Sequence, residues 1–308
     1  MARRRKGRPV NGVLVLDKPL HVSSNGALQH IKRALNAQKA GHTGALDPLA
    51  SGVLPICFGE ATKFSSYLLD ADKCYDCTVV LGETRNTGDG EGEIISEIDA
   101  SDLSESQILS ALATFRGEIE QVPPMHSALK KDGKPLYELA REGVEIEREA
   151  RRVVIHSLEL NAFRAGIKAE IDISVRCSKG TYIRSLAEDI GTVLNVGGCV
   201  KVLRRTQSGP YSLAQAVSVE EIDTLVEQRD FETLNAKLLA VETPLLHFPE
   251  VVLDPDTSFY VKRGNPVQVS DSPLDGKVRL RCENDGFLGI GEILDDGRIA
   301  PRRLVQAV

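Results

Sequence analysis

Strict alternation of apolar residues over 167–177 is the feature that most constrains the fold. Five apolar residues occupy every second position there: Ile167, Ala169, Ile171, Ile173 and Val175. In an extended strand such residues share one face. Residues 153–163 form a second strand-like segment, and Gly166 supplies a turn between the two. The pattern therefore predicts an antiparallel hairpin with one buried face.

The first 247 residues mix strands and helices without a regular strand–helix–strand repeat. Short strands are expected at 13–16, 75–81 and 200–203, and helices at 61–69, 104–115, 182–194 and 219–239. A further helix is expected to begin at a Ser23 or Ser24 cap and to end at Leu35. This mixture favours an α+β fold over a doubly wound parallel sheet.

The last 60 residues have a different character. Pro244 and Pro249 indicate a boundary near residue 248. Beyond it, short apolar segments are separated by glycine turns at positions 276, 286, 289, 291 and 297. This spacing predicts a small β-barrel module over 248–308.

Charge is unevenly distributed in this chain, whose net charge is −6. Residues 83–120 contain ten acidic and two basic side chains, whereas the first eight residues contain five basic side chains and no acid. The basic arm is either a solvated tail or a phosphate contact. No apolar run approaches the ~20 residues that span a bilayer, and no apolar stretch of signal-peptide length follows the arm. We expect a cytoplasmic protein without a membrane partner.

Several chemical classes are disfavoured by missing motifs. Cys74 and Cys77 form a single C-x-x-C inside a predicted strand, without a second pair or a spaced histidine, so no metal site is expected. The sequence has no P-loop, no G-x-G-x-x-G opening a helix and no G-x-S-x-G. Phosphoryl transfer, hydride transfer and serine hydrolysis are therefore disfavoured.

Four side chains allow both a structural and a functional interpretation. Asp47 precedes Pro48 in the glycine-rich loop 41–52, which is typical of a helix N-cap but also allows close approach of a ligand. Arg184 falls in the first turn of a predicted helix, where the helix dipole disfavours a cation, so it either reaches solvent or has an anionic partner. Tyr75 near a strand start is commonly a packing residue, and His42 is a lone loop histidine.

Taken in order, these segments resemble the TruB family of tRNA pseudouridine synthases. The resemblance covers about residues 10–245 and rests on these blocks: Val13-Leu-Val-Leu-Asp-Lys-Pro19, Gly41-His-Thr-Gly-Ala-Leu-Asp-Pro-Leu-Ala-Ser-Gly52, Lys73-Cys-Tyr75, Leu81-Gly-Glu-Thr84, Thr87-Gly-Asp-Gly-Glu-Gly92, Ser127-Ala-Leu-Lys130 with Leu136-Tyr-Glu-Leu-Ala-Arg-Glu-Gly143, Arg176-Cys-Ser-Lys-Gly-Thr-Tyr-Ile-Arg184 and Leu203-Arg-Arg-Thr206. One departure is His126, where relatives typically carry tyrosine.

The resemblance implies a fold and a domain organisation. It implies a mixed, largely antiparallel central sheet with flanking helices over residues 10–247, with an RNA-gripping insertion at about 120–152. Residues 248–308, including Val261-Lys-Arg-Gly-Asn-Pro-Val267, are similar to a PUA-type RNA-binding module.

The resemblance also implies an activity, the isomerisation of uridine 55 in the T-loop of tRNA to pseudouridine. The base is flipped out of its stack, and its uracil is detached, rotated and rejoined through C5. Asp47 is then the carboxylate that acts at the ribose–uracil junction, and Arg184 keeps it ionised. Tyr75 stacks on the uracil and takes part in C5 proton removal, whereas Tyr182 and Leu203 form pocket walls. Substrate and product contain the same atoms, so no cofactor is expected.

Four further residues are implied to contact RNA. His42 is expected to fill the stack that the flipped base leaves, Lys18 and Lys63 to meet phosphates, and Lys130 to lie where the insertion grips the T-arm. We expect a monomer that binds tRNA without a guide RNA. Two alternatives stay open: a guide-RNA-dependent pseudouridine synthase, and a tRNA-binding or tRNA-folding protein without catalysis.

Overall fold

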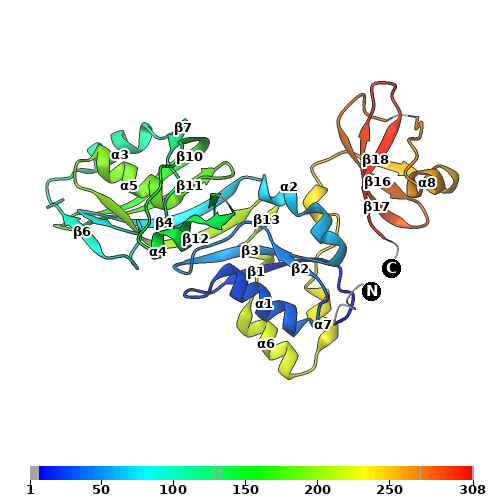
Figure 1. The fold of residues 1–308 in the computed structure, drawn as a ribbon, viewed down its shortest axis with the longest axis horizontal. Helices are drawn as coiled ribbons and strands as arrows, with labels where there is room; N and C mark the ends of the chain where they lie inside the picture. The colour runs from blue at the N-terminus through cyan, green and yellow to red at the C-terminus, as the bar shows by residue number, and fades with distance from the viewer. Residues whose placement is uncertain (1–6, 128, 132, 271, 307–308) are drawn as a thin grey trace.

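A long mixed sheet organises most of the chain. The computed structural model describes residues 7–127, 129–131, 133–270 and 272–306. Its ten-stranded sheet has the order β14-β1-β3-β12-β4-β11-β10-β7, with β13 paired to β12 and β2 paired to β3. Only the pairs β1–β14 and β3–β12 are parallel. The predicted α+β fold with a largely antiparallel sheet is confirmed (Figure 1).

The ten strands of this sheet span the following residues. They are β1 (Gly12–Lys18), β2 (Ala40–His42), β3 (Ala50–Phe58), β4 (Lys73–Leu81), β7 (Gly117–Gln121), β10 (Arg151–Arg164), β11 (Ala169–Cys177), β12 (Gly198–Ser208), β13 (Tyr211–Ser212) and β14 (Val217–Ser218). Two small sheets pair β5 (Glu83–Arg85) with β6 (Ile94–Glu97) and β8 (Lys130–Lys131) with β9 (Lys134–Pro135).

The predicted hairpin is confirmed as β10 and β11, which pair antiparallel. Ala169, Ile171, Ile173 and Val175 are buried on one face of β11, as their alternation indicates. Ile167 is 68% exposed, so its placement on that face was wrong. It lies in the turn before β11, where the backbone no longer follows the pleat of the strand.

Helices cover the buried face of the sheet. The helical segments of this part are α1 (Ser24–Ala34), η1 (Gly59–Phe64), α2 (Ser65–Leu69), α3 (Glu105–Ala113), α4 (Leu136–Arg141), α5 (Ile183–Val193), η2 (Leu213–Gln215), α6 (Val219–Glu227), α7 (Phe231–Ala236) and η3 (Thr243–Leu245). Ile31 of α1, Ile108 of α3 and Leu186 of α5 join the same apolar core as the inner face of the strands. This core holds β4, β12 and α5 together around the site described below.

The opposite face of β4, β11 and β10 carries ion pairs instead of helices. Arg164 pairs with Asp172 at 2.6 Å and with Glu170 at 3.1 Å, and Lys201 pairs with Glu170 at 2.5 Å. The hydroxyl of Thr78 donates to Asp172. Successive residues of each strand therefore serve two surfaces, one packed and one polar.

The C-terminal module forms a separate lobe (Figure 1). Its elements are β15 (Glu250–Leu253), α8 (Pro255–Lys262), β16 (Lys277–Cys282), β17 (Gly286–Ile293) and β18 (Ile299–Leu304). The four strands pair in the order β15-β16-β17-β18, and a bridge between Val267 and Ile299 adds a further pairing. The module has its own core and touches the rest of the chain through a small cluster of Phe64, Leu245 and Ile290.

The predicted basic arm lies mainly outside the described residues. Arg8, its described member, donates to the carbonyl of Leu35 and to the side chain of Asn235, so this guanidinium binds the protein itself. None of the helices in the described ranges has the length and apolar character needed to cross a membrane.

Candidate active site

Asp47 lies in a loop between β2 and β3. The interpretation of Asp47 as a helix N-cap was wrong, because a turn follows it and β3 begins at Ala50. Tertiary contacts hold this loop instead of a helix. The hydroxyl of Ser24 accepts from the amide of Leu46 at 2.7 Å and donates to its carbonyl at 2.9 Å. Ser23 caps α1, which leaves Ser24 free for this second task.

Arg184 meets Asp47 across the site. Its Nη2 atom lies 2.9 Å from Oδ2 of Asp47, and its side chain is only 5% exposed whereas that of Asp47 is 42% exposed. The same guanidinium donates to the carbonyls of Thr87 at 2.9 Å and His126 at 2.7 Å. Three neighbours thus hold an otherwise flexible side chain, and the charge-assisted bond fixes the Asp47 carboxylate beside it. The anionic partner that the helix dipole required of Arg184 is present.

A second carboxylate, Asp89, also faces Arg184. Its Oδ2 lies 3.8 Å from Nη1 of Arg184, and its side chain is buried. The hydroxyl of Thr87 donates to Oδ1 of Asp89 at 2.7 Å. The sequence did not single out Asp89, because Asp89 and Glu91 both lie between glycines in the Thr87–Gly92 block.

One cavity of about 300 Å³ brings five of the predicted residues together: Asp47, Tyr75, Tyr182, Arg184 and Leu203. Tyr75 and Leu203 point inward from neighbouring strands, β4 and β12. Burial raises the pKa of Tyr75 and that of Tyr182. The cavity thus combines the Asp47–Arg184 ion pair with aromatic and apolar side chains, and Lys73 and Arg205 add two basic side chains to its lining. Its aromatic rings suit a flat base.

Tyr182 is held by a buried glutamine. The side chain of Gln121 accepts from the amide of Tyr182 at 2.9 Å and donates to its carbonyl at 3.1 Å. Tyr182 itself is the N-cap residue of α5. The hydroxyl of the preceding residue, Thr181, donates to the carbonyl of Ser178. Gln121 links the end of β7 to the start of the helix that carries Arg184.

His42 ends β2, five positions before Asp47. Its Nδ1 atom is buried and has no hydrogen-bond partner within the described part of the chain. Burial, assisted by the positive charge of Arg205, lowers the pKa of His42. The ring is therefore neutral at neutral pH, which suits stacking better than phosphate binding.

The three predicted lysines lie outside the cavity. The structure does not offer Lys18 for the predicted phosphate contact, because Lys18 is fully buried and donates to the carbonyls of Pro19 and Val22. Burial lowers its pKa to about 8. Lys63 is also occupied, by Glu60 at 2.6 Å and by the carbonyl of Leu304 at 2.9 Å.

Lys130 has the exposure that the prediction requires. It lies in β8, a two-residue strand within the expected insertion at about 120–152. Its side chain faces solvent. The base of the same insertion reaches the site, because the His126 carbonyl binds Arg184.

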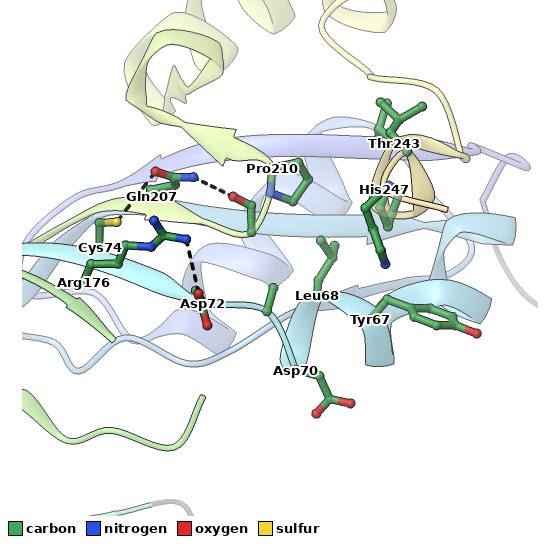
Figure 2. Close-up of a pocket in the computed structure, with 14 residues that line it drawn as sticks. Tyr67, Leu68, Asp70, Asp72, Cys74, Arg176, Gln207, Pro210, Thr243 and His247 are labelled. Atoms are coloured by element: carbon green, nitrogen blue, oxygen red, sulfur yellow. Dashed lines mark hydrogen bonds and ion pairs between the residues drawn. The ribbon is translucent and has the colours of Figure 1, made fainter. Parts of the chain in front are cut away.

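A second and larger cavity has a volume of about 490 Å³ (Figure 2). Cys74 lines it, whereas the flanking Lys73 and Tyr75 line the cavity of Asp47. None of the nine predicted site residues, all of them described, lines the larger cavity. Its polar groups pair among themselves, as Arg176 does with Asp72 at 3.4 Å. The smaller cavity is therefore the better candidate for chemistry.

Family models match most of this chain, between residues 32 and 305. The model of the TruB family pseudouridylate synthase N-terminal domain matches residues 32–183. The tRNA pseudouridylate synthase B C-terminal domain matches residues 184–246, and the C-terminal domain of pseudouridine synthase II TruB matches residues 249–305. The last two matches adjoin near residue 248, the boundary that Pro244 and Pro249 indicate.

Two similar proteins are both named tRNA pseudouridine synthase B. That of Saccharophagus degradans is 51% identical over 308 residues, covering 99% of this chain and 98% of its own length. That of Pseudomonas aeruginosa is 51% identical over 300 residues, covering 97% of each.

Solved structures share the fold. A Cbf5-Nop10-Gar1 complex contains a chain that is 26% identical, with a TM-score of 0.70, over 96% of this chain and 84% of that one. An H/ACA RNP bound to a substrate RNA matches in fold alone, at 23% identity and a TM-score of 0.73, over 99% of this chain and 92% of that one. The family models and the 51% identities confirm the resemblance read from the motifs. This chain belongs to the TruB family of pseudouridylate synthases.

Proposed function

We propose that this protein isomerises uridine 55 in the T-loop of tRNA to pseudouridine. The observation that carries the proposal is the Asp47 carboxylate, held 2.9 Å from Arg184 at a cavity lined by Tyr75, Tyr182 and Leu203. Relatives that are 51% identical over nearly the full chain bear the name tRNA pseudouridine synthase B. Uridine and pseudouridine have the same atoms and oxidation state, so the reaction is balanced without a cofactor.

Asp47 is the proposed catalytic carboxylate at the ribose–uracil junction. Arg184 lies 2.9 Å from this carboxylate and is itself held by the carbonyls of Thr87 and His126. The charge-assisted bond therefore fixes the position of Asp47 before substrate arrives.

The walls of the cavity suit a uracil that has left its stack. Tyr75 offers a ring for the base to stack on and an oxygen that can receive the C5 proton. Tyr182 and Leu203 confine the detached uracil, so that it rotates without escaping. His42, neutral and beside the cavity, fills the space that the flipped nucleotide leaves in the loop.

RNA is gripped by parts of the chain outside the cavity. We assign the T-arm contact to the insertion at 120–152, with Lys130 as an exposed cation, and a supporting RNA contact to the PUA-like module at 248–308. The long segment 83–150 and the acidic overall charge favour a chain that acts alone, as a monomer in the cytoplasm and without guide RNA. Activity of the purified chain on a bare tRNA transcript tests this stand-alone assignment.

Tritium release tests the function itself. A tRNA transcript that carries 5-tritiated uridine loses its label when C5 joins the ribose. Wild-type protein should release label without any added cofactor, and Asp47→Asn should release none while still binding tRNA. Asp70→Asn is a matched control, since Asp70 pairs with Lys179 outside the cavity. Equal release from wild type and Asp47→Asn would overturn the role of Asp47.

A further inference from the structure

Arg205 is a buried cation without an anionic partner among the described residues. It is 1% exposed and is one of the largest fully buried side chains. Its Nε atom donates to the carbonyl of Val53 at 2.7 Å, and Nη2 donates to the carbonyl of Gly44 at 3.1 Å. Both acceptors are neutral. Buried charges are normally paired, because an isolated charge is costly to remove from water.

Strand register places Arg205 beside Tyr75. Arg205 of β12 lies directly opposite Tyr75 on β4 and opposite Gly52 on β3. Directly opposed residues carry their side chains on the same face, with Cβ atoms about 5 Å apart. Arg205 and Tyr75 both line the cavity of Asp47.

Gly52 allows β3 to approach β12 closely at this point. Its φ angle is +103°, and a Cβ there would lie 2.2 Å from the carbonyl oxygen of Arg205. The close approach brings the Val53 carbonyl to the guanidinium of Arg205. The chain is therefore built to hold Arg205 rigidly at the cavity wall.

The positive charge of Arg205 acts to lower the pKa of each of three groups around it. Burial lowers the pKa of Lys73 to about 8, and Arg205 adds to this effect. Arg205 also adds to the burial that lowers the pKa of His42. At Tyr75 burial raises the pKa of the phenol, and Arg205 opposes that rise. Each effect disfavours added positive charge or favours negative charge in the cavity.

We propose that Arg205 is a positioning residue that holds a positive charge beside the Tyr75 oxygen while that oxygen receives the proton of uracil C5. This inference rests on the proposed function and deepens it. During isomerisation the N1–C1′ bond breaks and the C5–C1′ bond forms. The C5–H bond then breaks, its electron pair stays in the ring, and N1 takes up a proton from water. The Tyr75 hydroxyl, which is neutral because burial raises its pKa, gives its own proton to water as it takes the proton from C5, and Arg205 stabilises the negative charge on this oxygen during the transfer.

An isotope experiment separates this role from a structural one. Single-turnover rates are measured for tRNA transcripts containing uridine or 5-deuterouridine, with wild type, Arg205→Met, Arg205→Lys and Arg204→Met. Arg204 is the matched control, because it is the adjacent residue of the same type but points to the other face and pairs with Asp17 at 2.7 Å. Pseudouridine is quantified directly in the product RNA.

Arg205→Met should slow the reaction on the order of 100-fold, as expected for loss of a preorganised electrostatic contact. Its deuterium isotope effect should exceed that of wild type, since C5 proton removal becomes slower than the other steps. Arg205→Lys retains a cation and should return the isotope effect towards the wild-type value, and Arg204→Met should match wild type in both rate and isotope effect.

Two results would overturn the proposal. The first is a slow Arg205→Met reaction with an unchanged isotope effect, which would mean that Arg205 only supports the Gly44 loop. The second is an Arg205→Lys variant that folds and reacts slowly with an unaltered isotope effect. This result is decisive even if Arg205→Met does not fold. Failure of the proposed function is distinguishable, because wild type would then form no pseudouridine at all.

Discussion

Replacing Arg184 with methionine should reduce the reaction rate far more than tRNA affinity. Methionine approximates the length of the side chain but removes its charge and its bonds to Asp47, Thr87 and His126. Charge-assisted hydrogen bonds contribute about 1.5–3 kcal/mol each. If the bond to Asp47 is the one that matters in the transition state, losing 2–3 kcal/mol slows the reaction by about 30- to 150-fold.

The same substitution should also destabilise the protein. Asp89 is buried and would lose its cationic neighbour, and breaking such a pair costs about 3–5 kcal/mol. The 3.8 Å separation and the exposure of Asp47 argue for the lower end of that range. Urea unfolding measures this free energy, so that rates can be compared where the variant is fully folded.

Single-turnover tritium release with saturating protein measures the rate, and filter binding measures tRNA affinity. Arg176→Met is the control, because Arg176 pairs with Asp72 and is 59% exposed. A variant that binds tRNA weakly but converts bound tRNA at the wild-type rate would refute the argument that Arg184 acts on Asp47.

Three other substitutions test separate contacts. Asp89→Asn removes the second charge facing Arg184 and should slow tritium release about tenfold, or 1.4 kcal/mol, without weakening tRNA binding; an unchanged rate would contradict the pairing. Lys63→Met removes the bond to the Leu304 carbonyl, so protease should cut faster near residue 248; unchanged cleavage would show that this bond does not help to dock the module, which the apolar cluster and the Arg281–Glu242 ion pair also hold. Burial would raise the pKa of Glu83, but two cationic hydrogen-bond donors lower it from 4.5 to about 2. The stability from that pairing is complete above pH 4.5 and is lost as pH falls towards 2, so acid unfolding curves of wild type and Glu83→Gln should converge in that range.

The sequence predicted the parts of the fold whose signals are local. Alternation identified the hairpin of β10 and β11, and α3 lies within the helix expected at 104–115. The conflict between Arg184 and its helix dipole left two alternatives, exposure to solvent or an anionic partner, and the structure shows two carboxylates facing it. These predictions succeeded because each depends on a few neighbouring residues.

Predictions that depended on distant contacts were less successful. Asp47 before Pro48 has the pattern of a helix cap, yet Ser24 and β3 impose a loop. Lys18 looks like a surface cation but points inward from β1 to cap the carbonyls of the following turn. The importance of Arg205 depends on which face of β12 it occupies, and only the register with Tyr75 reveals that.

The site described above draws its parts from distant segments of the chain. Asp47 comes from an N-terminal loop, Tyr75 from β4, Arg184 from α5 and Arg205 from β12. Contacts between residues far apart in sequence form late in folding, because closing long loops costs entropy before the contacts compensate for it. Recovery of activity during refolding should therefore lag behind recovery of helical circular dichroism. In this chain, turnover is a stricter reporter of the completed fold than any spectroscopic signal from its helices.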